Sequence, residues 1–171
     1  KRETFSPVDA AWLRMDRPTN IMMITGIMMF DEPLDYARLR RVVEERLLPH
    51  RRFRQRVRDA ALGLPQWEDD PHFDVGTHLH RVALPAPGDL HTLQEMVGDL
   101  MSTPLDHNQP LWHFHIIENF NGGSALVGRL HHCIADGLAL MDVLLSMADD
   151  APDTLTPARR APIAARTGVP E

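Results

Sequence analysis

The sequence predicts a single α/β domain of the mixed (α+β) kind, in which helices and strands alternate along the chain. Three observations predict it: apolar residues recur at helical three-and-four spacing in some segments, strand-like alternation lies between them, and the composition is globular. Of the 171 residues, 43% are hydrophobic and 25% are charged. A chain of this length forms one domain with a substantial core, and the disordered and fibrous classes are excluded.

The first helix is predicted to begin at a capping residue. Ser6 can cap a helix, Pro7 suits the first helical position and Asp9 places an acid in the first turn. This helix is expected to end near residues 16–18. A buried strand is predicted over 21–30, because this mostly apolar run ends at an Asp-Glu-Pro turn.

Two further helices have clear signals. One runs from its cap, Asp35, to about residue 48, and the other covers 89–101. Both carry apolar residues three and four positions apart. Between them, residues 53–59 alternate between arginine and other side chains, which predicts a strand with one solvated face. A short strand is predicted at 78–84, within a stretch rich in loops.

A hairpin and a last helix complete the domain. Residues 111–118 and 124–130 alternate as strands, and the sequence Asn-Phe-Asn-Gly-Gly between them is a turn signal. A buried helix is expected over 137–147. From residue 149 the composition changes to Ala, Pro, Arg and Thr. We therefore predict a folded domain at 1–148 and a linker at 149–171 that leads to a further domain.

The charge balance and the single cysteine limit the classes of function. Lys and Arg total 18 against 24 for Asp and Glu, a formal charge of -6, which does not suit bulk nucleic-acid binding. Cys133 is the only cysteine, which excludes an intrachain disulfide and a multi-cysteine zinc site. No apolar run approaches the roughly 20 residues of a membrane span, and no signal peptide is visible, so a cytoplasmic location is expected.

The strongest candidate for chemistry is the run that joins the hairpin to the last helix, His131-His132-Cys133-Ile134-Ala135-Asp136-Gly137. Histidine suits proton abstraction near neutral pH, and the positive end of a following helix favours its neutral form. Gly137 allows a close backbone approach at the turn. Asp136 is also explained as a helix cap, and a histidine pair at a strand end often has only a structural role.

This run matches the HHxxxDG motif of the coenzyme-A-dependent acyltransferase superfamily, which includes chloramphenicol acetyltransferase-like enzymes and peptide-synthetase condensation domains. Two other segments resemble bacterial wax ester synthase/diacylglycerol acyltransferases: residues 6–12 followed by Pro-Thr-Asn at 18–20, and the triplet Pro110-Leu111-Trp112. The resemblance covers about residues 4–147. It implies the chloramphenicol acetyltransferase-like fold, a mixed sheet flanked by helices, as the first half of a two-domain enzyme.

The resemblance also implies an activity. A long-chain acyl group would pass from acyl-coenzyme A, a co-substrate, to diacylglycerol or a fatty alcohol, giving triacylglycerol or wax ester without a cofactor. By the family pattern His132 is the general base, and His131, Asp136 and Gly137 support its loop. The family's second half has no counterpart here. We therefore expect a part that is inactive alone, tends to associate, needs a separate C-terminal half, and lies peripherally on membranes or lipid droplets.

Two alternatives stay open. A condensation domain that forms peptide bonds carries the same motif. The other alternative is a non-catalytic or metal-binding module of this fold, because His113 and His115 share a strand face and could bind a metal with His131 or Cys133. The chemistry of the superfamily needs no metal, and we predict none. The arginine strip at 51–58 is most simply a solvated face, with contact to lipid or coenzyme A phosphates as the alternative.

Overall fold

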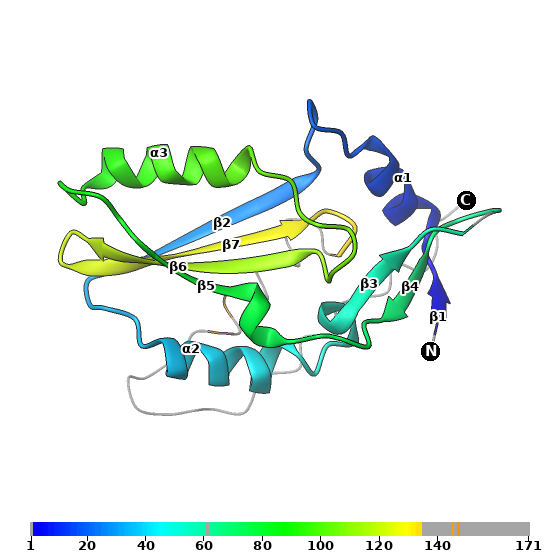
Figure 1. Cartoon of the computed structure of the whole chain (residues 1–171), viewed down its shortest axis with the longest axis horizontal. Coiled ribbons are helices and arrows are strands. Elements are labelled where there is room, and N and C mark those ends of the chain that lie inside the picture. The colour runs from blue at the N-terminus through cyan, green and yellow to red at the C-terminus, as the bar shows by residue number, and fades with distance from the viewer. Residues whose placement is uncertain (1, 61, 135–144, 146, 148–171) are drawn as a thin grey trace.

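A computed structural model of the chain describes residues 2–60, 62–134, 145 and 147. Within them the strands form two sheets, and helices lie on both faces of the larger one (Figure 1). This arrangement confirms the predicted mixed α/β class. The predicted helix over 137–147, apart from residues 145 and 147, and the predicted linker over 149–171 lie outside the described residues.

The larger sheet has four strands in the order β2-β7-β6-β5. Their bounds are Met23–Phe30 for β2, Leu79–Ala83 for β5, Trp112–Phe120 for β6 and Gly123–His131 for β7. β6 and β7 form the predicted hairpin, whereas β5 pairs with β6 in parallel, so the sheet is mixed. The hairpin turn needs positive φ at Asn119, Asn121 and Gly122, and Asn and Gly tolerate that conformation.

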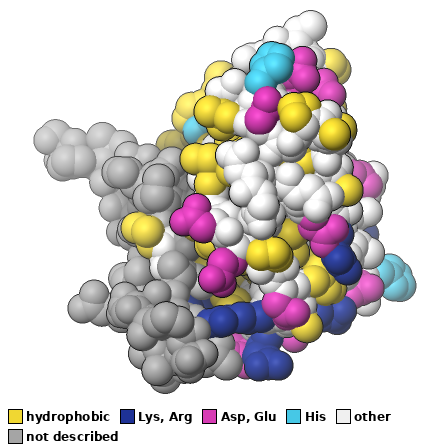
Figure 2. Space-filling model, turned by 90° about the vertical axis from the view of Figure 1, so that its left-hand side faces the viewer, with side chains coloured by type: hydrophobic (Ala, Val, Ile, Leu, Met, Phe, Trp, Pro, Cys, Tyr) yellow, Lys and Arg dark blue, Asp and Glu magenta, His cyan; other side chains and the backbone are white. Residues whose placement is uncertain are grey.

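β2 lies at the edge of this sheet and is less buried than predicted. Ile27 and Met29 are 45% and 60% exposed. Their partners across the sheet, Val127 and Ala125, are buried in an apolar cluster with Leu93 and Val97, and that cluster includes no residue of β2. Figure 2 views the end of the molecule that carries the hairpin turn. Hydrophobic side chains spread over the upper part of this face and basic side chains gather below.

The helices begin where the sequence predicted. α1 covers Pro7–Met15, α2 covers Tyr36–Val42 and α3 covers Leu90–Met101. The capping residues Ser6, Asp35 and Asp89 each accept a backbone N–H three residues further on. α2 continues as a π-helical turn over Val43–Leu47, close to the predicted end. α2 and α3 lie on opposite faces of the larger sheet, and each face has its own apolar core (Figure 1).

The smaller sheet was predicted only in part. Its order is β1-β4-β3, with bounds Arg2–Thr4 for β1, Gln55–Arg58 for β3 and Gln66–Asp69 for β4. The prediction of a strand over 53–59 is wrong for residues 53–54, because Arg51–Arg54 forms a 3-10 helix. Phe53 explains the difference, since its ring is fully buried and its carbonyl accepts the indole N–H of Trp112 at 2.8 Å. Packing therefore overrides the alternating pattern.

The start of β7 packs closely against the end of β2. A Cβ at Gly123 would lie 2.1 Å from the backbone oxygen of Phe30, so only glycine fits there. The hydroxyl of Ser124 donates to the carbonyl of Glu32 and accepts the N–H of Leu34, both at 2.9 Å. These contacts fix the hairpin to the connection between β2 and α2.

Candidate functional site

The two motif histidines lie where β7 ends. His131 is the last residue of the strand, and His132 opens the turn that follows. The N–H of His131 donates to the carbonyl of Leu111 at 3.0 Å, and the N–H of His132 donates to the carbonyl of Met22 at 2.9 Å. The backbone of the motif is thus held on both sides. Asp136 and Gly137 lie outside the described residues, and their roles stay predictions.

The ring of His131 is enclosed and neutral. Its side chain is 1% exposed, and its Nδ1 accepts the N–H of Cys133 at 3.1 Å. Nε2 lies 3.6 Å from Oδ2 of Asp16, just beyond hydrogen-bond distance. Burial lowers the pKa of His131 to about 4, and the nearby Asp16 carboxylate raises it by less. At neutral pH this histidine therefore carries no charge.

The ring of His132 lies flat against an aromatic side chain of α1. The Trp12 and His132 rings are stacked, with centroids 4.7 Å apart and planes inclined by 18°. Both side chains are half-buried. The stack engages the face of the imidazole, so it restrains the plane of the ring.

Asp16, at the C-terminal end of α1, connects several segments. Its Oδ1 accepts the N–H of Met22 at 2.8 Å, and its Oδ2 lies 3.0 Å from Nε2 of His107. Asp16, His107 and His131 form the group of three potential metal-ligating residues found in the described part of the chain, with ligand atoms within 4.8 Å of one another. Because Nδ1 of His131 accepts a hydrogen bond, its proton lies on Nε2, and that nitrogen offers no lone pair to a metal in this arrangement.

The triplet Pro110, Leu111 and Trp112 is buried at the entry to β6. The indole N–H of Trp112 donates to Phe53, and its carbonyl lies 2.7 Å from Nδ1 of His78. Leu111 provides the carbonyl that accepts the His131 N–H. The triplet therefore anchors the hairpin beneath the histidine pair.

His113 and His115 share one face of β6, but they belong to a column of imidazole rings. The rings of His78 and His113 stack at 5.0 Å and those of His80 and His115 at 4.8 Å, while the His80 and His113 rings are inclined by 42° with Nε2 of His80 2.9 Å from Nδ1 of His113. Burial lowers the pKa of His113 to about 3 and that of His115 to about 4. Neither belongs to a three-ligand group among the described residues, so this arrangement gives the metal-binding alternative no support.

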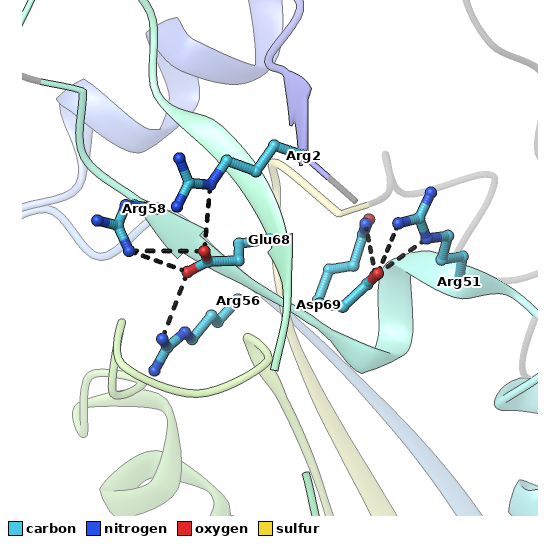
Figure 3. Close-up of polar contacts among 7 residues, drawn as sticks. Arg2, Arg51, Arg56, Arg58, Glu68 and Asp69 are labelled. Carbon is cyan, nitrogen blue, oxygen red and sulfur yellow. Dashed lines mark hydrogen bonds and ion pairs between the residues drawn. The ribbon is translucent and has the colours of Figure 1, made fainter. Parts of the chain in front are cut away.

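Figure 3 shows how acidic residues of β4 balance the arginine strip. Glu68 forms ion pairs with Arg2, Arg56 and Arg58 at 3.2–3.3 Å, and Asp69 forms one with Arg51 at 2.6 Å. The hydrogen bond from Arg51 is the main reason why the pKa of Asp69 lies below its usual range. Two open hollows beside this sheet, of about 240 and 380 Å³, are lined by aspartates as well as arginines. These ion pairs favour the interpretation of the strip as a structural surface.

Asp16 and His107 were not identified from the sequence. For α1 a signal existed, since Trp12 and Asp16 are four residues apart and thus share one face of the predicted helix. For His107 there was none, because it meets Asp16 and His131 only through the fold. Among the described helices, none is both long and apolar enough to cross a bilayer.

The sequence comparisons agree on a family. Residues 5–168 match the model of the wax ester synthase/diacylglycerol acyltransferase catalytic domain. A protein of Mycobacterium tuberculosis named as a probable diacylglycerol O-acyltransferase is 44% identical over 110 residues, covering 63% of this chain and 24% of the relative. A second one from that organism is 32% identical over 150 residues, covering 84% of this chain and 55% of the relative. The chain thus spans between a quarter and about half of these relatives.

The solved structures give the same result. A wax ester synthase/diacylglycerol acyltransferase from Marinobacter aquaeolei superimposes with a TM-score of 0.76 at 28% identity, covering 94% of this chain and 41% of that one. The starter condensation domain of rhizomide synthetase, at 16% identity and a TM-score of 0.69, covers 86% of this chain and 37% of that one, and shows the shared fold alone. The predicted chloramphenicol acetyltransferase-like fold is thereby confirmed. The chain belongs to the wax ester synthase/diacylglycerol acyltransferase family.

Proposed function

We propose that this chain is the histidine-bearing part of an enzyme that transfers a long-chain acyl group from acyl-coenzyme A to diacylglycerol or a fatty alcohol. His132 is the general base. The observation that carries this proposal is the placement of His132 at the end of β7, with its backbone bonded to Met22 and its ring stacked on Trp12, in a chain of this family. Acyl-coenzyme A is a co-substrate, and the reaction needs no cofactor.

The reaction is a nucleophilic substitution at the thioester carbonyl. His132 takes the proton of the acceptor hydroxyl while that oxygen attacks the carbonyl carbon. The new C–O bond forms, the C–S bond breaks, and the imidazolium returns the proton to the departing thiolate of coenzyme A. A positioned proton transfer of this kind contributes about 100- to 10,000-fold to a rate.

The two histidines have environments suited to different roles. The pKa of His131 is lowered to about 4 by burial, and its side chain is 1% exposed, so it neither reaches the acceptor nor competes for the proton. His132 is half-buried, and its ring stacks on Trp12. This difference supports His132 as the base and His131 as the residue that holds the loop.

The remaining partners belong to the same proposal. The chain spans between 24% and 55% of the relatives described above, so we infer that the rest of their length supplies a second half that completes the site. Exposed Ile27 and Met29 on β2 support an apolar contact with that half. We expect a cytoplasmic enzyme that associates peripherally with membranes or lipid droplets, where both acceptors reside.

The test measures thiol release from palmitoyl-coenzyme A with hexadecanol or diacylglycerol as the acceptor. It compares the chain alone, the chain with a candidate second half, and that pair with His132→Ala. His91→Ala is the matched control, because the His91 side chain is 79% exposed on α3. We expect acceptor-dependent release that needs both halves, disappears in His132→Ala and persists in His91→Ala.

Each outcome decides a different part of the proposal. No release with either acceptor contradicts the lipid substrates, and amine or peptidyl acceptors would then be assayed. Full activity of the His132→Ala pair contradicts the assignment of the base. Full activity of the chain alone contradicts the requirement for a second half.

A further inference from the structure

α1 and the residue that caps its C-terminus place one side chain beside each motif histidine. Trp12 stacks on the ring of His132, and Oδ2 of Asp16 faces Nε2 of His131 at 3.6 Å. Residues four apart lie on the same side of a helix, so one element fixes both rings. We propose that Trp12 and Asp16 are positioning residues for acyl transfer, an inference that rests on the proposed function of His132.

Asp16 and the backbone N–H of Cys133 favour the same tautomer of His131. The N–H of Cys133 donates to Nδ1 of His131, so that nitrogen must keep its lone pair and the proton lies on Nε2. Nε2 is buried, has no hydrogen-bond partner, and faces the Asp16 carboxylate. A carboxylate opposite an N–H stabilises this tautomer, and it would oppose the other one by placing two acceptors face to face.

Two short connections pass from Asp16 to His132. In the first, the ring of His131 bonds to the N–H of Cys133, and these two residues flank His132 in the chain. In the second, Asp16 accepts the N–H of Met22 at 2.8 Å, and the carbonyl of Met22 accepts the N–H of His132 at 2.9 Å. Loss of the Asp16 carboxylate would loosen both connections at once.

Trp12 acts on the charge of His132 as well as on its orientation. When His132 takes the acceptor proton it becomes a cation, and a cation over an indole face is attracted by the ring quadrupole. The stacked geometry, at 4.7 Å and 18°, places the imidazole plane over the indole. Trp12 should therefore make His132 a stronger base, which is an effect that a purely structural side chain would not have.

The first test compares Asp16→Asn with Asp16→Glu. Asp35→Asn is the matched control, because Asp35 is also a helix-terminal aspartate whose carboxylate accepts a backbone N–H. We expect kcat of the active preparation to fall about 100-fold in Asp16→Asn, because a misplaced catalytic group loses rate of this order. The KM for acyl-coenzyme A should stay unchanged. Asp16→Glu should recover part of kcat, and Asp35→Asn should retain all of it.

Nitrogen-15 NMR of the histidine rings gives a readout that does not depend on activity. We expect the proton of His131 on Nε2 in the unvaried chain and in Asp35→Asn. In Asp16→Asn the side-chain amide would place a donor opposite Nε2–H, so the population of the Nδ1–H tautomer should rise at the expense of the hydrogen bond from the Cys133 N–H. A His131 ring that keeps its proton on Nε2 in Asp16→Asn, or a kcat that does not change, would overturn the role of Asp16.

The second test uses the pH dependence of kcat/KM. Trp12→Leu should shift the acidic limb to lower pH by about half a unit, because the imidazolium loses its aromatic partner. Trp12→Phe, which keeps an aromatic face, should restore most of the shift. An unshifted limb in Trp12→Leu overturns the role of Trp12. Absence of ester formation by the unvaried pair refutes the proposed function instead, and the NMR comparison still decides whether Asp16 sets the tautomer.

Discussion

Buried neutral histidines should make this fold sensitive to mild acid. Burial lowers the pKa values of His113, His115 and His131 to about 3, 4 and 4. In the unfolded chain a histidine titrates near about 6.5. Between pH 6.5 and 4 the unfolded chain therefore binds more protons than the folded one, and the free energy of unfolding falls as the pH falls through this window.

The two most enclosed of these three rings set the magnitude. His115 is 7% exposed and His131 is 1% exposed. A pH of 5 lies about 1.5 units below the pKa of a histidine in the unfolded chain, and each unit is worth about 1.4 kcal/mol. Each ring therefore lowers the free energy of unfolding by about 2 kcal/mol. Together they remove about 4 kcal/mol relative to neutral pH, and His113 adds to this loss. A domain has about 5–15 kcal/mol in total, so the loss is a large part of it.

The assay is urea unfolding of the chain, followed by circular dichroism at pH values of about 7.5, 6 and 5. His115→Phe tests the cause, because it keeps a ring beside His80 and removes a titrating group whose Nε2 has no hydrogen-bond partner. We expect a smaller loss of stability with falling pH in that variant, and an unchanged loss in His91→Gln, whose side chain is 79% exposed. A free energy of unfolding that is constant between pH 7.5 and 5, or a His115→Phe slope equal to that of the unvaried chain, would refute the reasoning.

Two other predictions concern the support around the site. Trp112→Phe keeps a buried ring but leaves the carbonyl of Phe53 without its 2.8 Å donor. We therefore expect the free energy of unfolding in urea to fall by about 1–3 kcal/mol. An unchanged value would show that the hydrogen bond from the indole N–H contributes nothing to stability. Glu68→Gln removes the charge shared by Arg2, Arg56 and Arg58, so the melting temperature should fall in dilute buffer and fall less in about 1 M salt. A decrease of equal size at both salt concentrations would contradict an electrostatic origin.

Elements that depend on local chemistry were predictable from the sequence. The helices begin at Ser6, Asp35 and Asp89 because each cap acts within three residues of itself. The hairpin follows from residues that tolerate positive φ. β1 and β4 were missed because both are short and carry charged residues, and β1 pairs with β4 more than 60 positions along the chain. No periodicity within either segment reveals such a partner.

The residues of the candidate site were likewise predictable only in part. The histidine pair and the triplet at 110–112 could be identified as sequence motifs, and the structure adds the hydrogen bond between His131 and Leu111 that joins them. Asp16 and His107 were missed because only the fold brings them close to His131. They are 91 residues apart in the sequence, although their side chains contact each other. A helical wheel of α1 would have shown Trp12 and Asp16 on one side, but not what that side contacts.

The tight packing at the start of β7 also determines how the hairpin tip can change during evolution or protein engineering. The two glycines at this tip look equivalent in the sequence, yet a Cβ at Gly122 would meet nothing within 4 Å, whereas one at Gly123 would collide with the backbone of Phe30. Asparagine, which tolerates the φ of 80° at Gly122, is therefore an acceptable replacement there. A label or an inserted peptide belongs at residues 121–122, because any side chain one position later would separate the edge strand from the hairpin that presents the histidines.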